Sequence, residues 1–132
     1  MNSPPRLLLV DDCVAVRDLY ELALEPSFQV STANRGVEGL ALAMTEHPDV
    51  VVLDVLMPGL DGWETCAAIK SNPQTAGIPV ILLTAADDRD LTQHAIAVGA
   101  SALLNKPCPA DRLVNTILSA LINRPAPHTE AP

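Results

Sequence analysis

The chain has 132 residues, enough for one domain with a substantial core, and only 2% of them are aromatic, so the core must be aliphatic. The formal charge of −8 argues against direct binding to nucleic acid or to an anionic membrane, because both require a positive surface. Three scattered cysteines favour free thiols in a reducing cytoplasm. We expect neither a signal peptide nor a membrane span, since the start is polar and no apolar run approaches about 20 residues.

Short apolar segments alternate with longer segments of helical periodicity along the whole chain. In order, the sequence predicts strand Arg6–Val10, helix Val14–Leu24, strand Phe28–Ala33, helix Val37–Glu46, strand Val50–Leu53, helix Trp63–Ser71, strand Pro79–Leu83, helix Asp87–Val98, strand Ala102–Leu104 and helix Ala110–Ile122. Asp12 is a candidate N-cap for the first helix, and Gly99 is a candidate end for the fourth.

The strands are apolar throughout rather than alternating, which is typical of strands covered on both faces. The sequence therefore predicts an α/β fold, a doubly wound parallel sheet of five strands with helices on both sides and right-handed crossovers. We expect the domain to cover residues 6–123, residues 1–5 to be an N-terminal extension, and the proline-rich residues 124–132 to be a flexible tail or a linker stub.

Polar residues that can bind a ligand or take part in a reaction follow four of these strands. Asp11 and Asp12 follow the first strand, and Asp54 follows the third. Thr84 follows the fourth strand and Lys106 comes shortly after the fifth. Each residue alone has an ordinary explanation as a cap, a turn or a solvated side chain. Ligands of open α/β sheets bind beyond the carboxyl ends of the strands, so the joint placement favours a functional site.

Converging carboxylates raise one another's pKa unless a cation lies between them, and Mg²⁺ prefers carboxylate and phosphate oxygens. Asp11 and Asp12 would hold the metal, directly or through water. Asp54 can act as a nucleophile and form an aspartyl-phosphate. The negative charge of the transferred group needs positive partners and donors, which Lys106 and Thr84 can supply.

The residues that carry this chemistry form a pattern that resembles the receiver domain of bacterial two-component response regulators, the class that includes the chemotaxis response regulator. The resemblance covers about Arg6 to Ile122. The matching motifs are Val10–Asp12, Asp54–Gly62, Leu83–Ala85, Gly99–Ala100 and Lys106–Pro107.

The resemblance implies a flavodoxin-like fold and a signalling phosphoacceptor rather than an enzyme. A partner sensor histidine kinase or phosphotransfer protein would phosphorylate Asp54, and the product would alter the affinity for a downstream protein effector. Mg²⁺, or Mn²⁺, would be bound by Asp12, Asp54 and the backbone carbonyl of Leu56, with Asp11 acting through water. The resemblance also implies a cis peptide bond at Lys106–Pro107.

Two positions depart from the family pattern. The family couples the hydroxyl at Thr84 to an aromatic switch residue on the fifth strand, but that position is Leu103, so we expect a weaker or differently shaped switch. Leu56 and Ala86, two residues after Asp54 and Thr84, lack polar groups that could orient a hydrolytic water. We therefore expect a comparatively long-lived phosphoryl group.

Other functions remain as alternatives. Phosphatases with an aspartate nucleophile carry two aspartates on one strand with a single residue between them, whereas Asp11 and Asp12 are direct neighbours in the sequence. Flavin-binding modules need a phosphate loop rich in Ser, Thr and Gly, and the acidic segment after the first strand would repel phosphate. A receiver-like interaction module that is never phosphorylated is the third alternative. We expect a stand-alone regulator, with a domain of a larger regulator or hybrid kinase as the other arrangement.

Overall fold

The computed structural model describes residues 3–85 and 90–124. Strands and helices alternate throughout this part of the chain. They are β1 (Arg6–Val10), α1 (Val14–Leu24), β2 (Gln29–Ala33), α2 (Gly36–Glu46), β3 (Val50–Asp54), α3 (Gly62–Ser71), β4 (Val80–Thr84), α4 (Asp90–Ala97), β5 (Ala102–Asn105) and α5 (Ala110–Ile122). The predicted order of elements is confirmed, and most predicted boundaries lie within one residue of the observed ones.

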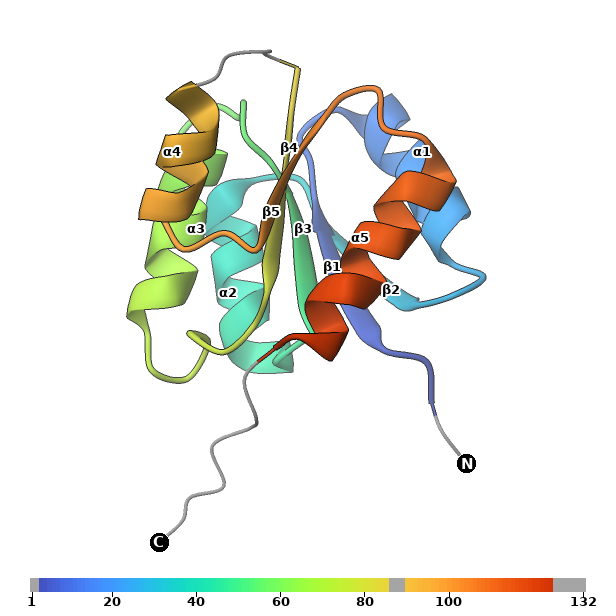
Figure 1. Ribbon diagram of the computed structural model, residues 1–132, viewed down its shortest axis with the longest axis horizontal. Coiled ribbons are helices and arrows are strands. Elements are labelled where there is room, and N and C mark those ends of the chain that lie inside the picture. Colours follow the sequence, from blue (N-terminus) through green and yellow to red (C-terminus); the bar gives the residue numbers. More distant parts are fainter. Residues whose placement is uncertain (1–2, 86–89, 125–132) are drawn as a thin grey trace, which may run out of the picture.

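The five strands form one parallel sheet in the order β2-β1-β3-β4-β5. Helices α2, α3 and α4 cover one face of the sheet, and α1 and α5 cover the other (Figure 1). The predicted doubly wound α/β fold is therefore confirmed. Reversal of the strand order beside β1 places the carboxyl ends of β1 and β3 next to each other, which is where ligands of such sheets bind.

The core is aliphatic and is divided by the sheet into two clusters. Along β1, Leu8 and Val10 pack into the cluster under α2, α3 and α4, whereas Leu7 and Leu9 pack into the cluster under α1 and α5. The strands β1, β3 and β4 are buried on both faces almost throughout, which explains why their sequences do not alternate. Each fully buried leucine contributes about 1.5–3 kcal/mol relative to an exposed one.

The loop after β3 is fixed by a capping box at the start of α3. Asp61 Oδ1 accepts a hydrogen bond from the Glu64 amide at 2.9 Å, and Glu64 Oε1 accepts one from the Asp61 amide at 3.1 Å. The Gly62 amide donates to the Val55 carbonyl at 2.8 Å, so the start of α3 lies directly against the end of β3. This close approach requires glycine, because a Cβ at Gly62 would overlap the Asp54 carbonyl oxygen.

The prediction that Asp12 is the N-cap of α1 is wrong. Cys13 occupies that position, with φ −86° and ψ 110°, and among the described residues no side-chain hydrogen bond caps the helix there. Helix α1 begins at Val14, as predicted, so its N-cap position falls on Cys13 and Asp12 lies one residue before it. The Cys13 amide donates to Asp11 Oδ1 at 2.9 Å, which closes a local turn ahead of the helix.

Helix α4 is joined to α3 by an aromatic stack. The rings of Trp63 and His94 have centroids 4.0 Å apart and an interplanar angle of 10°. Nearby, the buried Cys66 thiol donates to the Val98 carbonyl at 3.4 Å. The predicted start of this helix at Asp87 lies outside the described residues, and Gly99 follows its end with φ +83°, as expected for a residue that terminates a helix.

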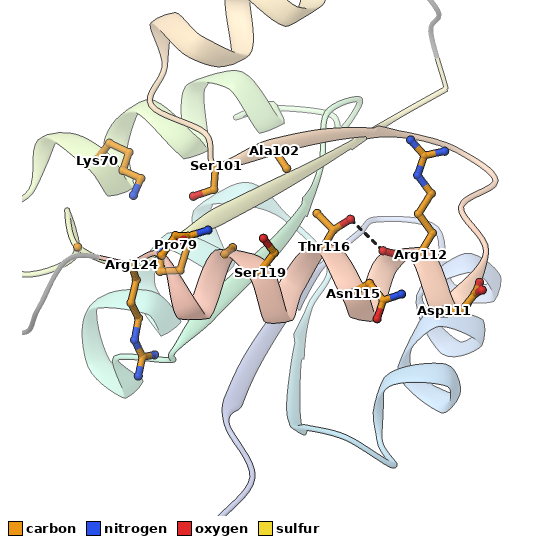
Figure 2. A pocket seen from close by; sticks show the side chains of 13 residues that line it. Lys70, Pro79, Ser101, Ala102, Asp111, Arg112, Asn115, Thr116, Ser119 and Arg124 are labelled. Carbon is orange, nitrogen blue, oxygen red and sulfur yellow. Dashed lines mark hydrogen bonds between the residues drawn. The ribbon is translucent and has the colours of Figure 1, made fainter.

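A shallow groove of about 590 Å³ runs along α5 beside the start of β5 (Figure 2). Its lining includes the polar residues Arg112, Asn115, Ser119 and Ser101. The aspartates predicted to form the functional site do not line this groove. The groove and the carboxyl ends of the strands are therefore separate features of the surface.

Candidate functional site

The sheet register places the predicted site residues at one edge. Val10, the last residue of β1, pairs with Leu53, so Asp11, which follows β1, lies at the same level as Asp54, which ends β3. Thr84 ends β4 and pairs with Asn105, and Lys106 follows directly. The Lys106 amide donates to the Thr84 carbonyl at 2.8 Å, which extends the ladder by one residue and fixes the backbone of Lys106.

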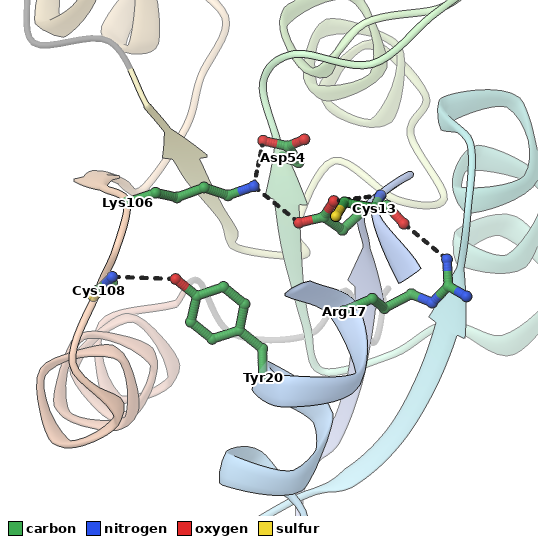
Figure 3. Close-up of polar contacts among 7 residues, drawn as sticks. Cys13, Arg17, Tyr20, Asp54, Lys106 and Cys108 are labelled. Atoms are coloured by element: carbon green, nitrogen blue, oxygen red, sulfur yellow. Dashed lines mark hydrogen bonds and ion pairs between the residues drawn. The ribbon is translucent and has the colours of Figure 1, made fainter. Parts of the chain in front are cut away.

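The ammonium group of Lys106 joins two of the aspartates. Its Nζ atom lies 3.0 Å from Asp11 Oδ2 and 3.0 Å from Asp54 Oδ1 (Figure 3). The Asp11 and Asp54 side chains are only 1% and 7% exposed, whereas that of Lys106 is 18% exposed. A charge buried to this degree is tolerated only when it is paired, and the bridging ammonium provides the pairing.

Asp11 is held from several directions. Its Oδ1 accepts from the Cys13 amide and its Oδ2 from Lys106. Its backbone carbonyl accepts from the Arg17 guanidinium at 2.9 Å, and its amide donates to the Ala33 carbonyl at 3.1 Å. Because both carboxylate oxygens are engaged, Asp11 is a rigid part of the site.

The third carboxylate is exposed and lies beside the other two. One carboxylate oxygen each from Asp11, Asp12 and Asp54 lies within 4.8 Å of the others. Three carboxylates and the Lys106 ammonium leave a formal charge of −2 at the cluster, which one divalent cation would balance. Clustered carboxylate oxygens with solvent access on one side fit Mg²⁺ or Mn²⁺, which retain water ligands.

Burial and the neighbouring charges shift the pKa values within the cluster. Burial raises the pKa of Asp54 above its ordinary value of 3.8, the hydrogen bond from Lys106 opposes the rise, and Asp11 adds to it. For Lys106, burial acts to lower the pKa, but its hydrogen bonds to Asp11 and Asp54 outweigh that effect and raise it. Lys106 is therefore a cation throughout the neutral range.

The other predicted site residues surround the cluster. Thr84 is buried at the end of β4, and Leu56 lies in the loop after β3 with an exposed side chain. Leu103 is half-buried on β5 and packs against the cluster under α2, α3 and α4. The peptide bond between Lys106 and Pro107 is cis. Ala86, which the hydrolysis prediction also uses, lies outside the described residues.

One polar contact near the site was not predicted. The hydroxyl of Tyr20 on α1 accepts a hydrogen bond from the Cys108 amide at 3.1 Å (Figure 3). In the helical pattern of α1, Tyr20 occupies an ordinary core position. The sequence signal for this contact is the segment Pro107-Cys108-Pro109, because its central residue has the segment's single amide hydrogen and that hydrogen needs an acceptor.

Comparison with known proteins identifies the family. A model of the response regulator receiver domain matches residues 7–118, which is most of the chain. The chain therefore belongs to the response regulator receiver domain family, the signalling domain of two-component systems. The structure of the chemotaxis protein CheY4 of Vibrio cholerae superposes with a TM-score of 0.84 at 31% identity, covering 89% of this chain and 98% of CheY4. The fold is accordingly the flavodoxin-like fold of that family.

Its relatives include proteins of different lengths. The response regulator PleD of Caulobacter vibrioides is 44% identical over 103 residues, which make up 77% of this chain and 23% of PleD. Protein PilH of Pseudomonas aeruginosa is 35% identical over 119 residues, covering 88% of this chain and 97% of PilH. The chain spans between 52% and 55% of the length of several other relatives.

The part of the chain that the structure describes contains neither a candidate membrane span nor a disulfide. Within residues 3–85 and 90–124, no helix is long and apolar enough to cross a membrane. The three cysteines are free: Cys13 is exposed, and Cys66 and Cys108 are buried.

Proposed function

We propose that the chain is a phosphoacceptor, and that Asp54 receives a phosphoryl group from a histidine kinase or a phosphotransfer protein. The observation that carries this proposal is the Lys106 ammonium, 3.0 Å from Asp54 and 3.0 Å from Asp11. It places a cation beside a buried carboxylate, with an exposed second aspartate adjacent. This combination suits a nucleophile whose product is a dianion.

In the transfer, a carboxylate oxygen of Asp54 attacks the phosphorus of a phosphohistidine. The P–N bond breaks, its electron pair returns to the imidazole, which takes up a proton, and a new P–O bond forms an acyl phosphate. Lys106 stabilises the charge on the phosphoryl oxygens, and Thr84, buried at the end of β4, provides a hydroxyl to one of them.

The carboxylate cluster is the place for a divalent cation. Bound by Asp12, Asp54 and the Leu56 carbonyl, with Asp11 acting through water, Mg²⁺ or Mn²⁺ would supply further positive charge to the phosphoryl oxygens. The buried Asp11 is already occupied by the Cys13 amide and by Lys106, which supports an indirect role for it. The exposed Asp12 is the carboxylate best placed to contact a hydrated ion.

The output is a change in affinity for a downstream protein partner. Phosphorylation replaces a carboxylate with a group of about −1.5 to −2 charge, which new contacts to Thr84 and Lys106 would convert into a shift between two conformations. Leu103 offers no ring to move with Thr84, so the rearrangement on β5 would be small. The chain acts alone or as the receiver of a longer regulator or hybrid kinase.

The test is to incubate the protein with acetyl phosphate, with Mg²⁺ or with EDTA, and to measure its intact mass. We expect one phosphoryl adduct that requires Mg²⁺ and is absent from Asp54→Ala. Asp61→Asn is the matched control, because it removes a carboxylate seven residues later while retaining an N-cap side chain. That variant should be labelled like the wild type.

Two results would contradict the proposal. An adduct that persists in Asp54→Ala would place the modification elsewhere. A folded wild-type protein that gains no adduct from acetyl phosphate, or from a histidine kinase already phosphorylated on its histidine, would indicate an interaction module that is not phosphorylated.

A further inference from the structure

The segment that leads from Lys106 to α5 has few ways to hold its position. Pro107 and Pro109 have no amide hydrogen, so Cys108 is the only residue between Lys106 and Ala110 that can donate a backbone hydrogen bond. The Cys108 amide donates to the Tyr20 hydroxyl at 3.1 Å. One side chain of α1 therefore satisfies the only backbone donor in this connection.

The contact is shielded from solvent. Tyr20 and Cys108 are each 7% exposed, and both belong to the core cluster under α1 and α5. Water has poor access to the Cys108 amide if the hydroxyl is removed, and a buried amide without a partner is unfavourable. The segment would then have to move to find another acceptor.

Lys106 is two residues from Cys108, and its ammonium must reach two buried carboxylates on different strands. Its backbone is fixed on one side by the hydrogen bond of its amide to the Thr84 carbonyl. On the other side, the first backbone group that is held in place is the Cys108 amide, which donates a hydrogen bond to the Tyr20 hydroxyl (Figure 3). Helix α1 also fixes Asp11, through the Arg17 guanidinium on the Asp11 carbonyl. The same helix thus holds both ends of the Lys106–Asp11 pair.

We propose that Tyr20 is a positioning residue for phosphoryl transfer, whose hydroxyl holds the Lys106–Pro109 segment so that the Lys106 ammonium faces Asp54. This inference rests on the proposed phosphorylation of Asp54. Tyr20 acts through the Cys108 amide and does not touch the reacting atoms. Its role differs from core packing because the phenyl ring alone would suffice for packing.

The first experiment compares the wild type with Tyr20→Phe, which retains the ring and removes only the hydroxyl. The measured quantity is the initial rate of adduct formation from acetyl phosphate at saturating Mg²⁺, by intact mass, on protein verified as folded by circular dichroism. We expect a rate about tenfold lower, as for the loss of one buried hydrogen bond that aligns a charged group. Saturating Mg²⁺ keeps any change in metal affinity from affecting the measured rate.

A double-mutant cycle separates positioning from a general loss of stability. If Tyr20 acts by placing the Lys106 ammonium, Tyr20→Phe will slow transfer in the wild type but have no further effect in Lys106→Ala. Thr75→Val is the matched control, since the buried Thr75 hydroxyl donates to the Ile69 carbonyl at 2.6 Å, far from the site in the fold. That variant should lose stability while keeping the wild-type rate.

A second measurement retains the Tyr20 hydroxyl. Tyr20 is the only tyrosine of the chain, so incorporation of 3-fluorotyrosine gives a single ¹⁹F resonance. We expect it to shift when Asp54 is phosphorylated, because Lys106 and the segment that follows it then engage the phosphoryl group. An unshifted resonance in phosphorylated protein, or equal slowing by Tyr20→Phe in both backgrounds of the cycle, would overturn the role of Tyr20. Absence of any adduct in the wild type would instead refute the proposed function.

Discussion

The Lys106 ammonium lies 3.0 Å from Asp54 Oδ1, so the carboxylate that would accept the phosphoryl group is paired with a cation beforehand. The pairing has two consequences. It keeps a desolvated carboxylate tolerable in the buried end of β3, and it places positive charge where phosphoryl oxygens would arrive. Stability and reactivity therefore depend on the same ammonium group.

Removal of this ammonium should destabilise the fold. In EDTA, Lys106→Met is expected to lower the free energy of unfolding by about 2 kcal/mol, because it leaves the Asp11 and Asp54 carboxylates buried without a counter-charge. Chemical denaturation measures the loss. Adding Asp54→Asn to this variant should restore part of the stability, since it removes one of the two repelling charges. A Lys106→Met protein as stable as the wild type would show that the pairing is not needed for folding.

Gly62 should not tolerate a side chain. A Cβ there would overlap the Asp54 carbonyl oxygen and lie 2.6 Å from the Val55 Cα atom. Gly62→Ala should therefore force α3 away from the end of β3 and lower the free energy of unfolding by about 2–3 kcal/mol. The control is Gly77→Ala, where a Cβ meets nothing within 4 Å and stability should change little. Equal stabilities in thermal unfolding would argue against the close contact.

The phosphoryl group should be lost slowly, and Leu56 is one reason. Its exposed side chain has no polar atom to orient a water toward Asp54. Leu56→Asn should shorten the lifetime of the adduct by about tenfold or more, since the amide side chain can orient the attacking water through a hydrogen bond. Intact mass at successive times after removal of the donor gives the lifetime. Leu56→Ala removes the leucine side chain without adding a polar group, and an equal acceleration there would refute this explanation.

The buried Cys66 thiol should make stability fall at alkaline pH. Burial raises the pKa of Cys66 from 9.0 to about 11. Between these values the unfolded chain releases the thiol proton and the folded chain retains it, so stability is fully present below pH 9 and is lost as the pH rises toward 11. The loss should reach roughly 2–3 kcal/mol.

Denaturation of the wild type and Cys66→Ala at several pH values isolates this contribution, because the other titrating groups are common to both. The difference in unfolding free energy between the two proteins should narrow as the pH rises. A constant difference would mean that Cys66 titrates at the same pH in the folded and unfolded states.

The sequence was sufficient to predict the sheet because its signals are local. The apolar strand Val50–Asp54 and the helix-breaking Gly99 act over a few residues, and the carboxyl ends of parallel strands must share one edge. The convergence of Asp11 and Asp54 followed from that geometry. In the structure the Lys106 ammonium lies 3.0 Å from both aspartates, and the chemical roles of these residues stay predictions.

The parts that sequence reasoning missed depend on competition or on distance. Asp12 is a good N-cap by residue type, but the helix begins at Val14 and its N-cap position is Cys13, whose amide donates to Asp11. The Tyr20–Cys108 contact joins residues 88 positions apart, and a tyrosine in a helical core position gives no sign of where its hydroxyl points. Both features arise from the choice of hydrogen-bond partners, which hydrophobic periodicity does not encode.

The two prolines around Cys108 have a further consequence for hydrogen exchange. From Lys106 to Pro109 the chain has only two exchangeable amides, one on the Thr84 carbonyl and one on the Tyr20 hydroxyl. Deuterium uptake at the first reports opening of the sheet edge, and uptake at the second reports release from α1. A pair of exchange rates would thus describe the opening of this whole segment, before and after phosphorylation.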